Sequence, residues 1–294
     1  MPGPSSPSPS TSLAVILPAY NEADRLGPAL DELFGYLRRR DTDTAGAGRD
    51  GVIGPGRLPH RIELIVVDDG STDATAQLVR DRPEAGLEAG PEAGSEAGPN
   101  GLAGVTLRVL TVPHGGKGAA VRAGMLAAES DLIVFTDADM ATPPDQIPLL
   151  VEALASADIA LGSRIQQDGI DMRKSQPPYR RLIGKVFHLL AAWWVVGSVK
   201  DTQCGFKGFT RAAARDLFTR QRVLSIVFDV EVIYLARRRG YRIVEVPVQW
   251  EDRRGSRMKA RLGLALRVAW DLFRIPLVHR SVGRVARPTS DAPG

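Results

Sequence analysis

Short apolar runs alternate with longer amphipathic stretches through the first half of the chain. Four runs rich in branched residues, at 13–17, 64–67, 105–112 and 132–135, each lead into polar residues. Such runs are typical of parallel strands buried on both faces. The stretches between them, at 24–40, 73–82 and 117–128, are predicted to be helices. This order predicts an α/β fold with a mostly parallel, Rossmann-like sheet and helices on both faces.

Two segments interrupt this alternation, residues 41–59 and 83–104. The second is built from near-copies of Glu-Ala-Gly that are too short and too polar to be structural repeats. We expect both to be mobile surface loops. The first residues lack the basic and apolar regions of a secretory signal, and disordered tails are predicted at 1–11 and 282–294.

Composition narrows the class of protein. The 294 residues are 44% hydrophobic, enough to fill one large core or two small ones. The single Cys204 excludes an intrachain disulfide and agrees with a reducing compartment, so we expect a cytoplasmic location. The longest apolar stretch, 182–199, contains Lys185 and His188 and falls short of the roughly 20 residues that cross a bilayer.

Positive charge gathers toward the carboxyl end, although the net charge is only +4. A basic segment of this kind favours an anionic partner. Within it, residues 261–277 are predicted to form an amphipathic helix, with Arg267, Asp271 and Arg274 on a polar face. Its apolar stripe comprises Leu262, Leu266, Ala269, Trp270, Phe273 and Leu277. The stripe can lie on an anionic membrane or pack on the sheet.

Two aspartates at the end of the fourth strand are the candidate metal ligands. Asp137 and Asp139 are two residues apart, so in an extended strand their side chains leave the same face. Mg²⁺ or Mn²⁺ typically takes one or two carboxylates and completes its shell with water and substrate phosphates. An isolated pair of this kind is also common as a strand end or a helix cap.

The motif after the second strand, VVDDGSTD, predicts a ligand-binding turn. Asp68 or Asp69 can accept hydrogen bonds from a base or a ribose while the other orients the loop, and the sequence does not divide these roles. Gly70 permits the tight turn, and Ser71 or Thr72 can cap the following helix.

Two further motifs complete the candidate nucleotide site. In PAYNE, Pro18 and Tyr20 can shape a face for a nucleobase, and Glu22 can reach ribose or lie in the first helical turn. The sequence PHGGKG at 113–118 lacks the first glycine and the Ser or Thr of an ATPase phosphate loop. Its glycines allow backbone to approach a nucleotide at a helix start, with Lys117 near phosphate.

Together these motifs resemble the family 2 glycosyltransferases of the glycosyltransferase A fold, in particular the polyprenyl-phosphate (dolichyl-phosphate) sugar synthases, over residues 12–259. The sequences FTDADMAT at 135–142, DTQCGFKGF at 201–209 and VPVQWEDRRGSRM at 246–258 are most similar to the dolichyl-phosphate β-glucosyltransferase branch. The resemblance implies UDP-glucose as donor. Mannosyl synthases commonly carry a metal-binding Gln where this chain has Ala141, so a third protein ligand is doubtful.

The resemblance also implies roles for individual residues. Asp137 and Asp139 would hold metal and diphosphate, and Asp201 would contact sugar hydroxyls. The nucleotide would be bound by Pro18, Tyr20, Glu22, Lys117 and one of Asp68 or Asp69. The phosphates of donor and acceptor would lie among Arg164, Arg180 or Arg181, and Arg253.

The implied reaction is inverting transfer of a hexose to a polyprenyl phosphate. A phosphate monoester is largely dianionic near neutral pH and needs no general base to attack the anomeric carbon. The implied location is peripheral, at the cytoplasmic face of the plasma membrane, with residues 186–196 and 261–277 as contact segments and no nucleic-acid partner. The alternatives are another donor such as GDP-mannose, a soluble acceptor, or a non-catalytic nucleotide-sugar-binding protein.

Overall fold

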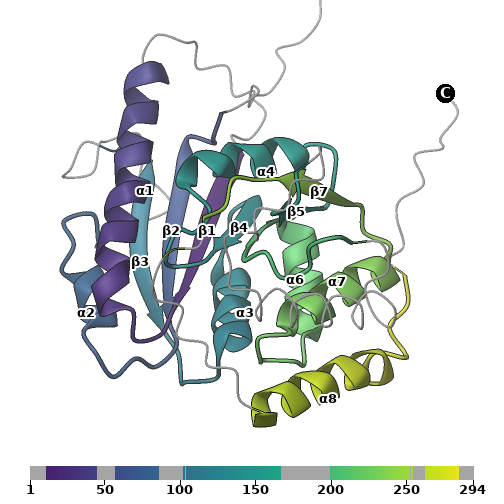
Figure 1. The fold of residues 1–294 in the computed structure, drawn as a ribbon. Coiled ribbons are helices and arrows are strands. Elements are labelled where there is room, and N and C mark those ends of the chain that lie inside the picture. Colours follow the sequence, from purple (N-terminus) through teal and green to yellow (C-terminus); the bar gives the residue numbers. More distant parts are fainter. Residues whose placement is uncertain are drawn as a thin grey trace, which may run out of the picture.

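A twisted central sheet with helices on both sides forms the body of the protein (Figure 1). The computed structural model describes residues 11–44, 57–85, 102, 104–166, 199–251, 253 and 262–284, with side chains for all of these except 40–44 and 262–267. Most of the two predicted loops, at 45–56 and 86–101, lies outside the described residues, as do 1–10 and 285–294 of the predicted tails.

Seven strands form one sheet in the order β3-β2-β1-β4-β6-β5-β7. Neighbouring strands pair in parallel, except that β6 runs antiparallel to both β4 and β5. The strands are β1 (Ser12–Ala19), β2 (Arg61–Asp68), β3 (Val105–Thr111), β4 (Leu132–Thr136), β5 (Ile159–Ser163), β6 (Phe206–Thr210) and β7 (Ile243–Pro247). The predicted mostly parallel α/β sheet is confirmed.

Alternate side chains of each central strand enter two separate cores. In β1, Ala14 and Ile16 pack into one core, whereas Leu13, Val15 and Leu17 pack into the other. Both sets are buried, which explains why the strands appear in the sequence as continuous apolar runs.

Helices cover both cores. On the side of Leu13 lie α1 (Ala23–Thr44), α2 (Thr75–Arg80), the 3-10 turn η1 (Pro144–Gln146) and α4 (Ile147–Ala153). On the side of Ala14 lie α3 (Lys117–Ala127), α6 (Arg211–Arg220), α7 (Phe228–Arg239) and α8 (Leu262–Val278). Figure 1 shows this division, with α1 and α4 opposite α3, α6 and α7.

The start of α2 corrects one expectation. We expected Ser71 or Thr72 to cap a helix beginning near residue 73, but the helix begins at Thr75 and its N-cap residue, Ala74, makes no side-chain cap. Ser71 Oγ instead accepts a hydrogen bond from Asn21 N at 2.9 Å, and Asp73 Oδ1 accepts one from Thr75 N. The Ser71 hydroxyl therefore joins the turns after β1 and β2 rather than capping α2.

The helix α8 packs with the face opposite to its predicted apolar stripe. Leu272 and Ile275 are buried against the core with α7, and Asp271 is buried as well. Trp270, Phe273 and Leu277 of the stripe are 61%, 49% and 52% exposed. The alternative that this stripe packs on the sheet is therefore wrong for these three residues. None of the described helices is long and apolar enough to cross a bilayer.

Candidate active site

The carboxyl ends of β1, β2 and β4 bring the predicted motifs to one edge of the sheet. Because β1 lies between β2 and β4 and runs parallel to both, the residues that follow all three strands lie at the same edge. Ala19 at the end of β1 is in register with Asp68 at the end of β2. This edge is where an open α/β sheet binds its ligands.

Asp69 holds the loop that leads into α3. Its two carboxylate oxygens accept hydrogen bonds from Gly115 N at 2.8 Å and Gly116 N at 2.9 Å, and its side chain is almost fully buried. Gly70 has a positive φ of 68°, and a Cβ there would lie 2.9 Å from His114 N. Asp68 Oδ1 accepts from Ser71 N at 3.1 Å. The structure thus gives Asp69 the loop-orienting contacts, a division that the sequence left open.

An aromatic pair lies at the rim of this loop. The Tyr20 and His114 rings stack with their centroids 4.2 Å apart, and His114 Nδ1 lies 2.9 Å from Asp69 Oδ2. Both side chains are exposed. Sequence reasoning missed His114, although it stands in the PHGGKG motif, because a histidine in a loop carries no periodic signal. The pair offers a flat face to a nucleobase.

Arg25 connects Glu22 with the carboxylates after β4 and was also missed. Its Nε lies 2.6 Å from Glu22 Oε2, and one terminal nitrogen lies 3.9 Å from Asp139 Oδ2. The hydrogen bond that Arg25 donates to Glu22 raises the pKa of Arg25, so the guanidinium is a fixed positive charge beside Asp139.

Asp137 and Asp139 lie in a turn rather than in a strand. The strand β4 ends at Thr136, Met140 N donates to Asp137 O, and Met140 has a positive φ of 50°. The expectation that strand alternation points both side chains to one face is therefore wrong. Asp139 Oδ1 also accepts from Ala141 N at 3.1 Å, a local contact of the kind expected of a turn aspartate.

Cations nevertheless surround both carboxylates. Lys117 Nζ at the start of α3 lies 2.5 Å from Asp137 Oδ1. Burial lowers the pKa of Lys117, but Asp137 and Asp229 outweigh this effect and the net shift is upward. Burial and the neighbouring Asp137 raise the pKa of Asp139, despite the opposing charges of Arg25 and Lys117. Burial of the Asp139 carboxylate is thus the larger cause of this shift, and the repulsion from Asp137 adds to it.

Arg164 and Asp201 form a buried two-point ion pair at the end of β5. Arg164 Nε and its terminal nitrogen lie 2.8 and 2.7 Å from the two oxygens of Asp201, and Arg164 N donates to Asp201 at 3.0 Å. Burial lowers the pKa of Arg164, and Asp201 raises it by more. The Asp201 carboxylate is therefore engaged in orienting Arg164, while its predicted contact with sugar hydroxyls stays a prediction.

Arg253 forms an ion pair with a carboxylate of α1. Its two terminal nitrogens lie 2.7 and 3.0 Å from the carboxylate oxygens of Glu32. The Glu32 hydrogen bond raises the pKa of Arg253, with Asp139 adding to the shift. Arg180 and Arg181, and the segment 186–196 predicted to reach lipid, lie outside the described residues.

A second buried ion pair, between β6 and α7, was not predicted from the sequence. Lys207 Nζ in β6 lies 2.7 Å from Asp229 Oδ1 in α7, and it donates to Cys204 O at 2.5 Å. The ammonium also lies 5.4 Å from the centre of the Phe135 ring. The partners are 22 residues apart, and although Lys207 lies in the sequence DTQCGFKGF at 201–209, its position there does not indicate Asp229 as a partner.

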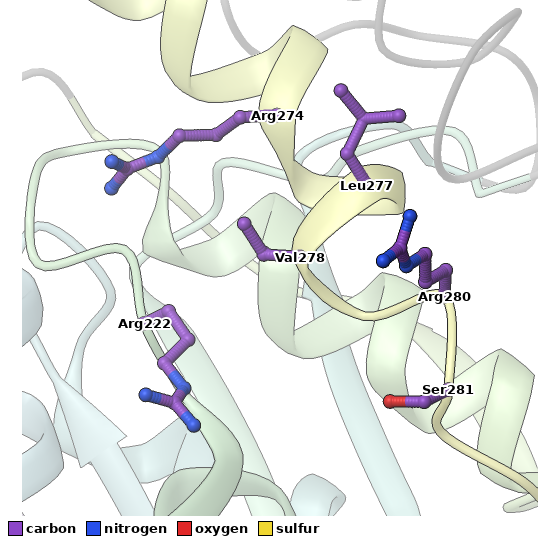
Figure 2. A pocket seen from close by; sticks show the side chains of 6 residues that line it. All are labelled: Arg222, Arg274, Leu277, Val278, Arg280 and Ser281. Atoms are coloured by element: carbon purple, nitrogen blue, oxygen red, sulfur yellow. The ribbon is translucent and has the colours of Figure 1, made fainter.

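The described residues contain no group of three or more His, Cys, Asp or Glu side chains arranged to hold a metal. A pocket of about 450 Å³ lies elsewhere, between the end of α8 and the loop before α7 (Figure 2). Its lining consists of Arg222, Arg274, Leu277, Val278, Arg280 and Ser281. Three arginines line this pocket beside α8, whereas the carboxylates lie at the sheet edge.

The mostly parallel seven-stranded sheet with helices on both faces is a fold of the glycosyltransferase A type. Residues 14–218 match Glycosyl transferase family 2. The chain belongs to this family and is a glycosyltransferase.

Relatives with known names cover most of the chain. It is 34% identical to a dolichyl-phosphate β-glucosyltransferase of Trichomonas vaginalis, over 95% of this chain and 74% of that protein. It is 36% identical to the dolichyl-phosphate β-glucosyltransferase of Drosophila melanogaster, over 85% and 70% of the two chains. The human enzyme of that name is 33% identical, over 85% and 71%.

Solved structures agree on the fold. Glucosyl-3-phosphoglycerate synthase from Mycobacterium tuberculosis in complex with UDP superimposes with a TM-score of 0.56 at 18% identity, covering 94% of this chain and 82% of that one. The same enzyme with Mn²⁺, UDP-glucose and phosphoglyceric acid gives a TM-score of 0.52 at 16% identity, covering 95% and 82%. At these identities the likeness concerns the fold alone.

Proposed function

We propose that this glycosyltransferase moves glucose from UDP-glucose to a polyprenyl phosphate such as dolichyl phosphate, with inversion at the anomeric carbon. The observation that carries the proposal is the placement of Asp137 and Asp139 at the ligand-binding edge of the sheet, among Lys117 and Arg25. The names of the relatives at 33–36% identity support the sugar and the lipid acceptor.

The uridine end of the donor fits the half of the edge built from β1, β2 and the start of α3. The exposed Tyr20 and His114 rings supply a stacking face, and Glu22 and Asp68 supply acceptors for ribose or base. Asp69 accepts hydrogen bonds from Gly115 N and Gly116 N and so fixes the loop that places Lys117, at the start of α3, beside the diphosphate.

The carboxylates fit Mg²⁺ or Mn²⁺. Hard oxygen ligands suit either ion, and two carboxylates suffice when donor phosphates and water complete the shell. Asp137 and Asp139 would hold the ion, which would neutralise charge on the departing diphosphate. Lys117 Nζ lies 2.5 Å from Asp137 Oδ1 and supplies a second positive charge near the same phosphates.

The acceptor phosphate is its own nucleophile. One of its oxygens forms a bond to the anomeric carbon while the bond from that carbon to the diphosphate oxygen breaks, and no proton moves. We propose that Arg164, which Asp201 holds at two points and whose guanidinium lies 5.5 Å from the centre of the Trp250 ring, pairs with this phosphate. The protein's main contribution is to align two anions whose repulsion opposes the reaction.

The lipid acceptor requires contact with a membrane, and α8 presents a surface for it. Trp270, Phe273 and Leu277 are exposed, while Arg222, Arg274 and Arg280 line the adjacent pocket (Figure 2). Exposed aromatic and aliphatic side chains beside arginines suit the interface of an anionic bilayer. We propose that this surface lies on the cytoplasmic face of the plasma membrane.

The loop before α7 contacts both α8 and the start of α3. Ser225 Oγ donates to Asp271 Oδ2 in α8 at 2.7 Å, and Gly118 N donates to the carbonyl of Leu224 in the same loop at 3.1 Å. Gly118 follows Lys117 in α3. The loop at 224–225 therefore contacts both α8 and the helix start that carries Lys117.

The transfer reaction is tested by supplying UDP-[¹⁴C]glucose, MgCl₂ or MnCl₂ and a polyprenyl phosphate in detergent. Label should enter the organic phase, and Asp139→Ala should lower the rate by about 10²-fold or more. Asp145→Ala, which removes an exposed carboxylate in η1, is the matched control and should leave the rate unchanged. Label in a new water-soluble glucoside would point to a soluble acceptor, and preference for GDP-mannose would change the donor. Nucleotide binding without transfer would indicate a non-catalytic protein.

Membrane contact is tested by sedimentation with vesicles of phosphatidylcholine containing phosphatidylserine. The double substitution of Trp270 and Phe273 by Ser should reduce binding, whereas Leu149→Ser, at an exposed leucine of α4, should not. Equal binding of all three proteins would exclude α8 as the contact surface.

A further inference from the structure

The turn that enters β6 passes directly against the carboxylate of Asp137. The antiparallel pairing of β6 with β4 sets Phe206 opposite Thr136, so the residue before Phe206 faces the residue after Thr136. These residues are Gly205 and Asp137. A Cβ built on Gly205 would lie 2.5 Å from Asp137 Cγ and 2.6 Å from Oδ1, and closer still to Oδ2.

Conformational freedom does not explain a glycine at this position. The described positive-φ glycines are Gly70, Gly104, Gly116 and Gly240, and Gly205 is not among them. Other residues could therefore adopt its backbone angles. What a side chain at position 205 lacks is space, and the atoms that occupy this space are the three terminal atoms of Asp137.

The turn itself is anchored and cannot easily move back. Lys207, fully buried, donates to the carbonyl of Cys204 on one side of Gly205 and pairs with Asp229 of α7. The strand that follows is hydrogen-bonded to β4 on one side and β5 on the other. The Asp137 side chain, in contrast, is 36% exposed and has solvent on its outer side. A methyl group at position 205 would therefore displace the carboxylate rather than the strand.

We propose that Gly205 is a positioning residue for Asp137: its missing side chain lets the β6 turn support the carboxylate in the direction in which it binds the divalent cation. This deepens the proposed function, since it rests on Asp137 being a metal ligand. It also assigns a role to Lys207 and Asp229, which fix the turn at Cys204 without touching substrate.

The test compares Gly205→Ala with Gly208→Ala in the full chain. Gly208 lies on the same strand, but a Cβ there would meet the apolar side chains of Leu154 and Leu150 at 3.1 and 3.3 Å, away from Asp137. Mn²⁺ binding is measured by electron paramagnetic resonance, with Mn²⁺ alone and with UDP. Gly205→Ala should weaken Mn²⁺ binding about tenfold or more, and Gly208→Ala should leave it unchanged.

A thermodynamic cycle on the metal-free protein tests the contact between position 205 and Asp137 without measuring metal binding or activity. Unfolding by urea is measured for Gly205→Ala, Asp137→Ala and the double variant. Because Asp137→Ala removes the atoms that a methyl group would meet, Gly205→Ala should destabilise the wild-type background more than the Asp137→Ala background. If Gly205→Ala fails to fold alone but folds with Asp137→Ala, the proposal is supported.

Three results would overturn the proposal: wild-type Mn²⁺ affinity in Gly205→Ala, equal destabilisation in both backgrounds, or no Mn²⁺ binding by the wild-type protein. Failure of glucose transfer is a separate outcome, because neither metal binding nor the folding cycle requires an acceptor or a sugar.

Discussion

The two halves of the site are held together by different interactions. On the side of β1, β2 and α3, carboxylates accept hydrogen bonds from backbone N–H groups of neighbouring turns, as Asp69 does from Gly115 and Gly116. On the side of β5 and β6, carboxylates pair with buried cations, as Asp201 does with Arg164 and Asp229 with Lys207.

This difference separates two physical roles. A carboxylate that accepts several hydrogen bonds from backbone N–H groups can lose one of these bonds and keep the others. A buried ion pair instead fixes a charge, and removing one partner leaves the other unpaired away from water. The nucleotide half should therefore tolerate single substitutions better than the β5–β6 half.

Removal of the Asp229 carboxylate should have the largest effect on stability. Asp229→Ala leaves the Lys207 ammonium buried without its carboxylate, and the free energy of unfolding should fall by about 3–5 kcal/mol. Urea unfolding measures this change. The double variant Lys207→Met/Asp229→Leu should recover most of the loss, because no unpaired charge remains. A loss below about 1 kcal/mol in Asp229→Ala would show that the pair contributes no more than a surface contact.

Asp201→Asn should have the next largest effect, and on activity rather than on folding. The amide keeps the shape of the carboxylate but can no longer accept from Arg164 with both terminal atoms. Because the guanidinium loses its fixed direction, kcat/KM for transfer should fall about 10²-fold. Steady-state kinetics with varied acceptor would measure this fall, and an unchanged kcat/KM would remove Arg164 from the proposed phosphate site.

Cys204 gives a pH-dependent probe of the turn before β6. Burial, and next Asp201, raise the pKa of its thiol to about 12. The unfolded chain ionises near pH 8.5 while the folded protein keeps the proton, so this contribution to stability is complete below about pH 8.5 and is lost as the pH rises toward 12. At pH 10 the loss should reach about 2 kcal/mol.

Urea unfolding of the wild type and of Cys204→Ser at pH 8 and pH 10 measures this term, because serine does not titrate in this range. The stability difference between the two proteins should shrink by that amount at the higher pH. A constant difference would show that the thiol is accessible to solvent in the folded protein.

Asp69→Asn should have the smallest of these effects. The amide oxygen can still accept from one of the two glycine N–H groups, so we expect a stability loss of about 1 kcal/mol. The disturbed loop should weaken UDP binding about tenfold, measured by calorimetry. A loss as large as that of Asp229→Ala would erase the distinction between the two halves.

The sequence predicted the half of the site built from β1, β2 and α3 better than the half built from β5 and β6. The strands and helices up to residue 136 were predicted because apolar runs and polar turns alternate locally, and the motifs at their ends lie at one sheet edge as expected. The pairing of Lys207 with Asp229 and the closeness of Gly205 to Asp137 could not be predicted, because both depend on the antiparallel entry of β6 between β4 and β5.

Side-chain direction was the least predictable property. Asp137 and Asp139 were expected in an extended strand but lie in a turn after β4. The apolar stripe of α8 was recognised from its spacing, yet spacing alone could not decide which face packs inward. Asp271 and Ile275 face the core, because Ser225 binds Asp271 and α7 contacts the helix.

Metal binding by Asp137 and Asp139 is tested by a crystal structure of the protein with Mn²⁺ and UDP, in which anomalous scattering locates the metal. We expect a single strong peak about 2 Å from carboxylate oxygens of Asp137 and Asp139, with the diphosphate bound to the same ion. A peak bound elsewhere, or a diphosphate seated away from both side chains, would contradict it.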